Sequence, residues 1–214
     1  MSKFFYRNIP SHHMDGFYPV RHSFDNFKNI LKVAEIVNTS SHCLVGEDGL
    51  GFDLAIFTGE YKRVLIKKID GYFSMSIPFQ IVENGNHISF SYDFIEENVS
   101  GMFISIMRNI ITTSSGGVSH EDVILSLVDD FSLSVLDAIK YYDSFVFLIS
   151  DDHGYFRFDD DVANENGDVH PRYHVDVFYK NTTSIKIGYN KNDELNCFYS
   201  LVDSSWPKKY LLSR

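Results

Sequence analysis

The chain has 214 residues, of which 44% are hydrophobic and 22% are charged. This balance suits a globular protein with a buried core, and one domain over residues 1–214 is expected. The formal net charge is −10, from 29 acidic and 19 basic residues. That charge argues against nucleic-acid binding because phosphate recognition depends on Lys and Arg, although a local basic patch or a bridging metal ion leaves that class open.

Cysteine usage and hydropathy give an expected compartment. Cys43 and Cys197 are the only cysteines, and two unpaired thiols are typical of a reducing environment. The N-terminal residues lack the apolar core of a secretory signal, and no apolar run reaches the length of a membrane span. We therefore expect a cytoplasmic protein with no membrane contact, and the sequence leaves its oligomeric state open.

The N-terminal half predicts one helix followed by strands. Phe24, Phe27, Leu31 and Ala34 recur at helical spacing within residues 24–38, with Ser23 as the expected N-cap. An antiparallel meander is expected over residues 42–95, because Asp70-Gly71 is a strong hairpin signal and residues 87–94 alternate between apolar and polar side chains. Pro78, inside a predicted strand, implies an edge position or a bulge.

The middle of the chain predicts further helices. Residues 99–113 fit either a helix or a β-branched strand, and the spacing of Met102, Ile106 and Ile110 favours the helix. Ser119 and Asp122 resemble a capping box that opens one bent helix, or a helix pair, through about residue 142. A subdivision of the chain near residues 114–119 is the alternative to a single domain.

The C-terminal third predicts a return to sheet. The expected strands cover residues 145–149, 155–159, 172–179, 184–189 and 196–202. With the aromatic excess, 19 Phe and 13 Tyr against one Trp, this favours an α+β fold. Its sheet is predominantly antiparallel, formed by the N-terminal meander and the C-terminal strands, with two or three covering helices.

One stretch of these C-terminal strands concentrates polar chemistry. Side chains alternate across a strand, so Arg157 and Asp159 share one face while Phe158 takes the other. On the next strand His174 and Asp176 share a face opposite Val175. If the two strands are neighbours, the four polar side chains converge. His170 lies near the same rim, but Pro171 leaves its direction open.

Three interpretations of this patch are open. Histidine and carboxylates can hold a divalent metal ion that activates water, which makes His170, His174 and Asp176 candidate ligands. Arg157, Asp159, His174 and Asp176 are also candidate catalytic residues, with a histidine and a carboxylate as general base and orienting partner and Arg157 on phosphate. The third interpretation is a solvated sheet face on which unlike charges pair across strands.

Other polar groups carry weaker signals. His12, His13 and Asp15, followed by Arg21 and His22, are best explained as a polar loop before the first helix. Asp151-Asp152-His153 has the composition of a hairpin turn. Gly46-Glu-Asp-Gly49-Leu-Gly51 lacks the spacing of a dinucleotide-binding loop, and Ser115-Gly-Gly117 lacks a phosphate-binding lysine.

The pattern Arg157-Phe158-Asp159-x-Asp161, an acidic loop, then His170-Pro171-x-x-His174 resembles one found in uncharacterised prokaryotic domains of anti-phage defence and toxin–immunity loci. The likeness covers about twenty residues and implies a bacterial, intracellular, accessory role without any catalytic assignment. Asp176 stands where some of those domains have a second histidine.

Two functions are therefore expected in competition. The first is a binding or accessory protein of a bacterial defence or toxin–immunity system, which acts through protein partners and needs no cofactor. The alternative is a metal-dependent hydrolase, a nuclease among them, with a divalent metal ion held by the patch of Asp159, His170, His174 and Asp176.

Overall fold

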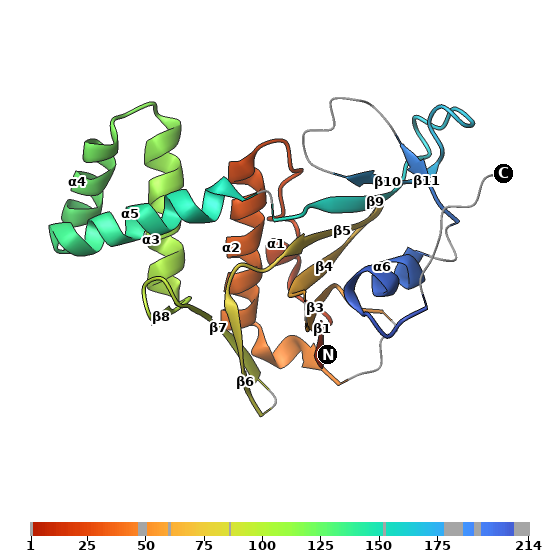
Figure 1. Ribbon diagram of the computed structural model, residues 1–214, viewed down its shortest axis with the longest axis horizontal. Helices are drawn as coiled ribbons and strands as arrows, with labels where there is room; N and C mark the ends of the chain where they lie inside the picture. Colours follow the sequence, from red (N-terminus) through yellow and green to blue (C-terminus); the bar gives the residue numbers. More distant parts are fainter. Residues whose placement is uncertain are drawn as a thin grey trace. The chain divides into compact units, whose positions relative to one another are not determined.

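The computed structural model describes residues 2–46, 51–59, 61–85, 87–151, 153–177, 186–190 and 194–207. It has an α+β fold with an eight-stranded sheet, a three-stranded sheet and several helices (Figure 1), as the sequence predicted. The chain forms two compact units. The first takes in residues 1–9, 43–77 and 153–214, and the second takes in residues 10–42 and 78–152. The expectation of a single domain stays a prediction.

The first unit is built on the eight-stranded sheet, in which all neighbouring strands are antiparallel. In spatial order its strands are β11 (Ile187–Gly188), β10 (Tyr173–Val177), β9 (Phe156–Asp160), β5 (Gly71–Ser76), β4 (Arg63–Lys68), β3 (Leu54–Thr58), β1 (Ser2–Tyr6) and β2 (Leu44–Val45). The three C-terminal strands therefore extend the sheet beyond β5, which comes from the N-terminal half of the chain.

One face of this sheet is closed by a helix. Phe57 and Leu65 from the central strands and Phe158 from β9 pack with Phe198 and Val202 of helix α6 (Glu194–Val202) in one buried cluster. The Phe57 and Phe198 rings lie 4.9 Å apart in edge-to-face geometry, an arrangement that adds to the free energy gained from burial. Phe158 thus anchors β9 to the core and fixes which side chains of β9 point to the opposite face.

The second unit combines helices with the small sheet. Its helices are α1 (Ser11–Met14), α2 (Ser23–Thr39), α3 (Gly101–Ser115), α4 (His120–Phe131) and α5 (Val135–Ser150), and its strands are β6 (Gln80–Asn84), β7 (His87–Tyr92) and β8 (Glu97–Asn98). A 3-10 turn, Ser41–Cys43, follows α2. The helices α2 to α5 pack on one another, and α2 also contacts β7.

Most predicted helices are confirmed. The α2 helix matches its prediction, but its N-cap is His22 and not Ser23; the His22 N–H donates a hydrogen bond to the Asp25 carboxylate. Residues 99–113, which fitted either a helix or a strand, lie largely in the helix α3. Ser119 and Asp122 form the expected capping box of α4. The helix pair, not one bent helix, is correct, because Ser132 takes a left-handed conformation (φ 54°) that ends α4.

Two predicted strands are wrong. Residues 145–149 form the last turns of α5, and residues 196–202 lie in α6. Both segments are short and rich in apolar and aromatic residues, a pattern that suits a buried strand as well as a helix. In α6 the spacing of Leu195, Phe198 and Val202 follows the helical period, and these residues join the core cluster.

The predicted meander is divided between two sheets. Strands β3 to β5 belong to the eight-stranded sheet, and β6 to β8 form the small one. Pro78 lies between β5 and β6 and is not part of a strand, because proline has no N–H to contribute to a ladder. The Asp70-Gly71 hairpin is confirmed, although Gly71 is already the first residue of β5 and pairs with Lys68.

Candidate metal centre

The two strands that carry the polar patch are neighbours. Strands β9 and β10 pair antiparallel, with His174 opposite Asp159, Asp176 opposite Arg157, and Val175 opposite Phe158. Phe158 and Val175 face the core cluster. The four polar side chains therefore share the other sheet face, as strand alternation predicted. Their functional role stays a prediction.

Arg157 connects the two carboxylates. Its Nη2 donates a hydrogen bond of 2.6 Å to Asp176 Oδ2, and its Nε lies 2.7 Å from Asp159 Oδ2. The Nε contact is an ion pair without hydrogen-bond alignment, since Nε is buried with no hydrogen-bond partner. Lys186 adds a second positive charge, with Nζ 2.7 and 2.8 Å from the two oxygens of Asp176. Two cations thus neutralise two carboxylates.

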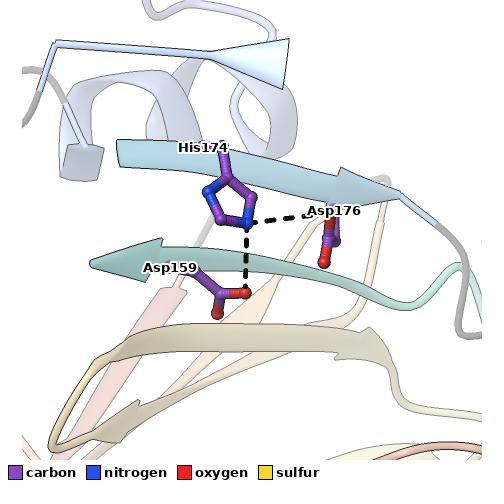
Figure 2. A group of neighbouring side chains, drawn as sticks. All are labelled: Asp159, His174 and Asp176. Atoms are coloured by element: carbon purple, nitrogen blue, oxygen red, sulfur yellow. Dashed lines mark ion pairs between the residues drawn. The ribbon is translucent and has the colours of Figure 1, made fainter. Parts of the chain in front are cut away.

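His174 is the most deeply buried member, with 1% of its side chain exposed. Its Nδ1 lies 2.8 Å from the carbonyl oxygen of Pro171. A carbonyl oxygen only accepts hydrogen bonds, so Nδ1 carries a proton and donates it. Nε2 has no hydrogen-bond partner and lies 3.5 Å from Asp159 Oδ2 and 3.9 Å from Asp176 Oδ1 (Figure 2). A buried polar atom without a partner is costly and calls for an explanation.

The two carboxyl groups differ in acidity. Burial raises the pKa of Asp159 above its ordinary value, and the charge of Arg157 offsets only part of this effect. Burial alone would also raise the pKa of Asp176, but the hydrogen bond from Lys186 and the charge of Arg157 outweigh it and hold that pKa below its ordinary value. Asp176 is therefore the more firmly ionised of the two.

The donor atoms suit a metal ion. Asp159, His174 and Asp176 each offer a ligand atom, and these atoms lie within 4.8 Å of one another. In a tetrahedral zinc site with bonds of about 2.0–2.1 Å, ligand atoms are about 3.3 Å apart. The histidine-to-carboxylate distances of 3.5 and 3.9 Å are therefore only a few tenths of an ångström too long for a bound ion.

The backbone contact of His174 also suits a metal ligand. Histidines that bind metals usually donate the other ring N–H to a carbonyl or carboxylate, which fixes the tautomer and directs the remaining lone pair at the ion. The hydrogen bond from Nδ1 to Pro171 leaves Nε2 directed at the carboxylates. Pro171 thereby acquires a positioning role that the sequence did not suggest.

His170 lies beside this centre but outside it. Its Nε2 is 3.1 Å from Asp161 Oδ2, and its ring is edge-on to that of His174 with centroids 4.9 Å apart. It is not part of the group of Asp159, His174 and Asp176. The prediction of His170 as a ligand therefore stays untested, and its nearest carboxylate is that of Asp161.

An open depression of about 460 Å³ borders the centre. Arg157 and Asp159 line both the depression and the charge network, whereas His174 and Asp176 do not line the depression. Lys68, Asp160 and Asp161 lie on other parts of its wall. Of the three candidate ligands, Asp159 is therefore the one that lies on the wall of this depression.

The other polar groups noted in the sequence are placed elsewhere. His12 and His13 lie on the short helix α1, where His13 Nε2 is 3.5 Å from Thr39 Oγ1. His22 caps α2, and His153 is buried in the turn before β9. In the part of the chain that the structure describes, Asp159, His174 and Asp176 are the one group of three that could hold a metal ion.

No family model, curated protein or solved structure matches the chain. The resemblance to prokaryotic defence and toxin–immunity domains thus stays a prediction. Among the described residues, no helix combines the length and apolar character needed to cross a bilayer, which agrees with the expected absence of a membrane span.

Proposed function

We propose that the protein binds a divalent transition-metal ion through Asp159, His174 and Asp176 and acts as a metal-dependent hydrolase. The observation that carries this proposal is the buried Nε2 of His174, which lacks a hydrogen-bond partner and lies between two carboxylates. A metal ion there would satisfy Nε2 and bind both carboxylates at once.

The competing explanation is a structural network without metal. Arg157 and Lys186 already balance the charges of Asp159 and Asp176, and such a network can stabilise neighbouring strands by itself. It leaves the buried Nε2 of His174 without a hydrogen-bond partner. The network also predicts that the site is formed before the metal binds, so the protein should fold without it.

The ligand types favour particular ions. One imidazole and two carboxylates suit Zn²⁺, Mn²⁺, Fe²⁺ or Co²⁺, whereas Mg²⁺ and Ca²⁺ prefer oxygen ligands alone. Three protein ligands leave at least one position for water, as in catalytic zinc sites. An ion held by these residues would make bound water more acidic and so would supply a nucleophile for a carbonyl or phosphoryl centre.

The depression beside Asp159 gives the expected substrate side. Its volume of about 460 Å³ is in the usual range for a small-molecule site. Its wall holds four aspartates (Asp70, Asp159, Asp160, Asp161) against two basic side chains (Lys68, Arg157). This balance favours a small substrate over a long polyanion, so a nuclease is the less supported of the hydrolases.

Metal binding is tested by calorimetric titration of chelator-treated protein with Zn²⁺ and Mn²⁺, and by melting curves. An ion at one hundred times its dissociation constant should stabilise the protein by about 2.7 kcal/mol. Asp159→Asn should weaken binding at least about tenfold, and His174→Gln should abolish it. Because His174 is buried, metal-free melting curves will show whether that variant folds.

The matched control is His170→Gln. It removes a neighbouring histidine that lies outside the group of three, so metal affinity should be unchanged. A wild-type dissociation constant weaker than about 1 mM for every ion, or equal losses in His170→Gln and Asp159→Asn, would contradict the metal centre.

Hydrolysis is tested separately by incubating metal-loaded protein with chromogenic carboxylic esters, amides, phosphomonoesters and phosphodiesters. We expect activity that EDTA removes and that Asp159→Asn loses. A protein that binds metal but hydrolyses none of these classes would restrict the centre to metal binding. The accessory role in a bacterial defence or toxin–immunity system remains the second proposal, tested by co-purification with the products of neighbouring genes.

A further inference from the structure

The helix α5 exposes apolar side chains along most of its length. Its inward face buries Ala138, Tyr141, Phe145 and Leu148. Its outward face, called here the α5 face, consists of Val135, Leu136, Ile139, Val146 and Phe147, of which Leu136 is 79% and Phe147 64% exposed. Exposed apolar side chains gathered on one helix face are typical of an interaction surface.

The α5 face is continuous along the helix and extends onto a neighbouring turn. Positions 136, 139, 143 and 147 follow the three- and four-residue spacing of one helical side. Phe94, itself 50% exposed, stacks on Phe147 with ring centroids 6.3 Å apart and an interplanar angle of 13°. Figure 1 shows α5 (teal) running across α3 and α4, with which it packs.

The charged residues of the α4 and α5 helices and of the segments that flank them are mostly acidic. Residues 119–151 contain seven carboxylates (Glu121, Asp122, Asp129, Asp130, Asp137, Asp143, Asp151) and one lysine, Lys140. Asp143 is exposed on the outward side between Ile139 and Phe147. A second copy of the chain would bring the same acidic surface against itself, so like-charge repulsion opposes self-association through this face.

We infer that the α5 face is a docking surface for a basic amphipathic helix of a partner protein. The apolar residues supply anchors at helical spacing, and the surrounding carboxylates attract Lys and Arg on the rims of the partner helix. Asp143 lies where it would meet a basic side chain close to the apolar contact. This inference is independent of the metal centre, which belongs to the other compact unit.

The test is fluorescence anisotropy of the full-length protein with a labelled Leu/Lys amphipathic peptide of about 18 residues, or five helical turns. The comparison peptide carries Glu in place of Lys. The basic peptide should bind at least about tenfold tighter than the acidic one, and its affinity should fall as salt rises.

Variants locate the contact. The double variant Leu136→Ser/Phe147→Ser should weaken binding of the basic peptide by at least about tenfold, because two apolar anchors are lost. Asp143→Lys should reduce the preference for the basic peptide. Leu201→Ser, which removes another exposed leucine (57% exposed) from α6, should leave binding unchanged. Melting curves will confirm that each variant is folded.

Several outcomes would overturn the inference. One is peptide binding that Leu136→Ser/Phe147→Ser leaves intact, or that Leu201→Ser weakens equally. Another is sedimentation that shows a dimer which the double variant dissociates, since the α5 face would then bind a second copy. A third is co-pelleting with phosphatidylcholine vesicles that the double variant loses, because the surface would then serve a lipid bilayer.

Discussion

Gly71 allows strands β5 and β9 to approach closely beside Asp159. Its φ of +139° disfavours other residues, and a Cβ there would overlap the carbonyl oxygen of Phe158. Gly71→Ala should therefore lower the free energy of unfolding by more than about 2 kcal/mol. Urea denaturation measures this change. Gly46→Ala, which meets no atom within 4 Å, is the control, and equal effects of both substitutions would refute the explanation.

Glu35 forms an ion pair with each of two cations. Arg108 Nη2 and Lys32 Nζ lie 2.9 and 2.8 Å from Glu35 Oε2. The hydrogen bond from Arg108, with a smaller one from Lys32, outweighs burial and lowers the pKa of Glu35 to about 2. A lowered pKa in the folded state means that this stability is complete above the unfolded value and is lost as pH falls toward 2.

Glu35→Gln should therefore destabilise the protein by about 1 kcal/mol at pH 7, a figure reduced for solvent screening because Arg108 is 44% exposed. The difference from the wild type should shrink as pH falls from about 4.5 to about 2. Urea midpoints across this pH range measure it. Glu83→Gln, on an exposed position of β6, should have little effect, and a pH-independent loss in Glu35→Gln would contradict the ion-pair explanation.

How much of the candidate site the sequence predicts also depends on individual residues. Strand alternation placed Arg157 with Asp159 and His174 with Asp176, because side-chain direction in a strand has a fixed period. That the two pairs converge depends on the pairing of β9 with β10, which the sequence left as a condition. Lys186 was not predicted, since its contact with Asp176 depends on how β11 meets β10. The hydrogen bond from His174 to the carbonyl of Pro171 was not predicted either, because backbone direction in a turn leaves no periodic signal in the sequence.

At the scale of single elements, the α4 helix depends on its cap. Ser119 Oγ accepts a hydrogen bond of 3.2 Å from the Asp122 N–H, and the Asp122 carboxylate accepts from the Ser119 N–H. Ser119→Ala should cost about 1 kcal/mol, measured by urea denaturation. Ser105→Ala within α3, where the hydroxyl bonds to the Gly101 carbonyl, should be neutral or slightly stabilising. Equal losses in both would argue against the cap.

The errors of element type share one cause. The end of α5 resembled a buried strand because both faces of that helix carry apolar residues, so no polar position marked the helical period. The strand predicted over residues 196–202 was wrong in a similar way, because this segment lies in α6. By contrast, α2 and α4 were recognised because polar residues alternate with apolar ones at helical spacing, and Ser119 opens α4 as predicted.

At the scale of the whole molecule, composition and turn chemistry were enough for the α+β class. The sequence suggested a subdivision only near residues 114–119. The boundaries of the two compact units were not predicted, because both units contain sheet residues and no Pro- or Ser-rich linker separates them in the sequence. The pairing of β5 with β9 was not predicted either, since no local sequence pattern specifies which distant strand pairs with the edge of a sheet.

That pairing has a consequence for biosynthesis. Strand β5 ends at Ser76 and its neighbour β9 begins at Phe156, so closing this part of the sheet joins segments about eighty residues apart and carries the entropic cost of a long loop. During translation, β5 leaves the ribosome well before β9, so one edge of β5 stays unpaired until β9 has been synthesised. Asp159, His174 and Asp176 can assemble only after this delay, so the candidate centre is among the last parts of the sheet to form.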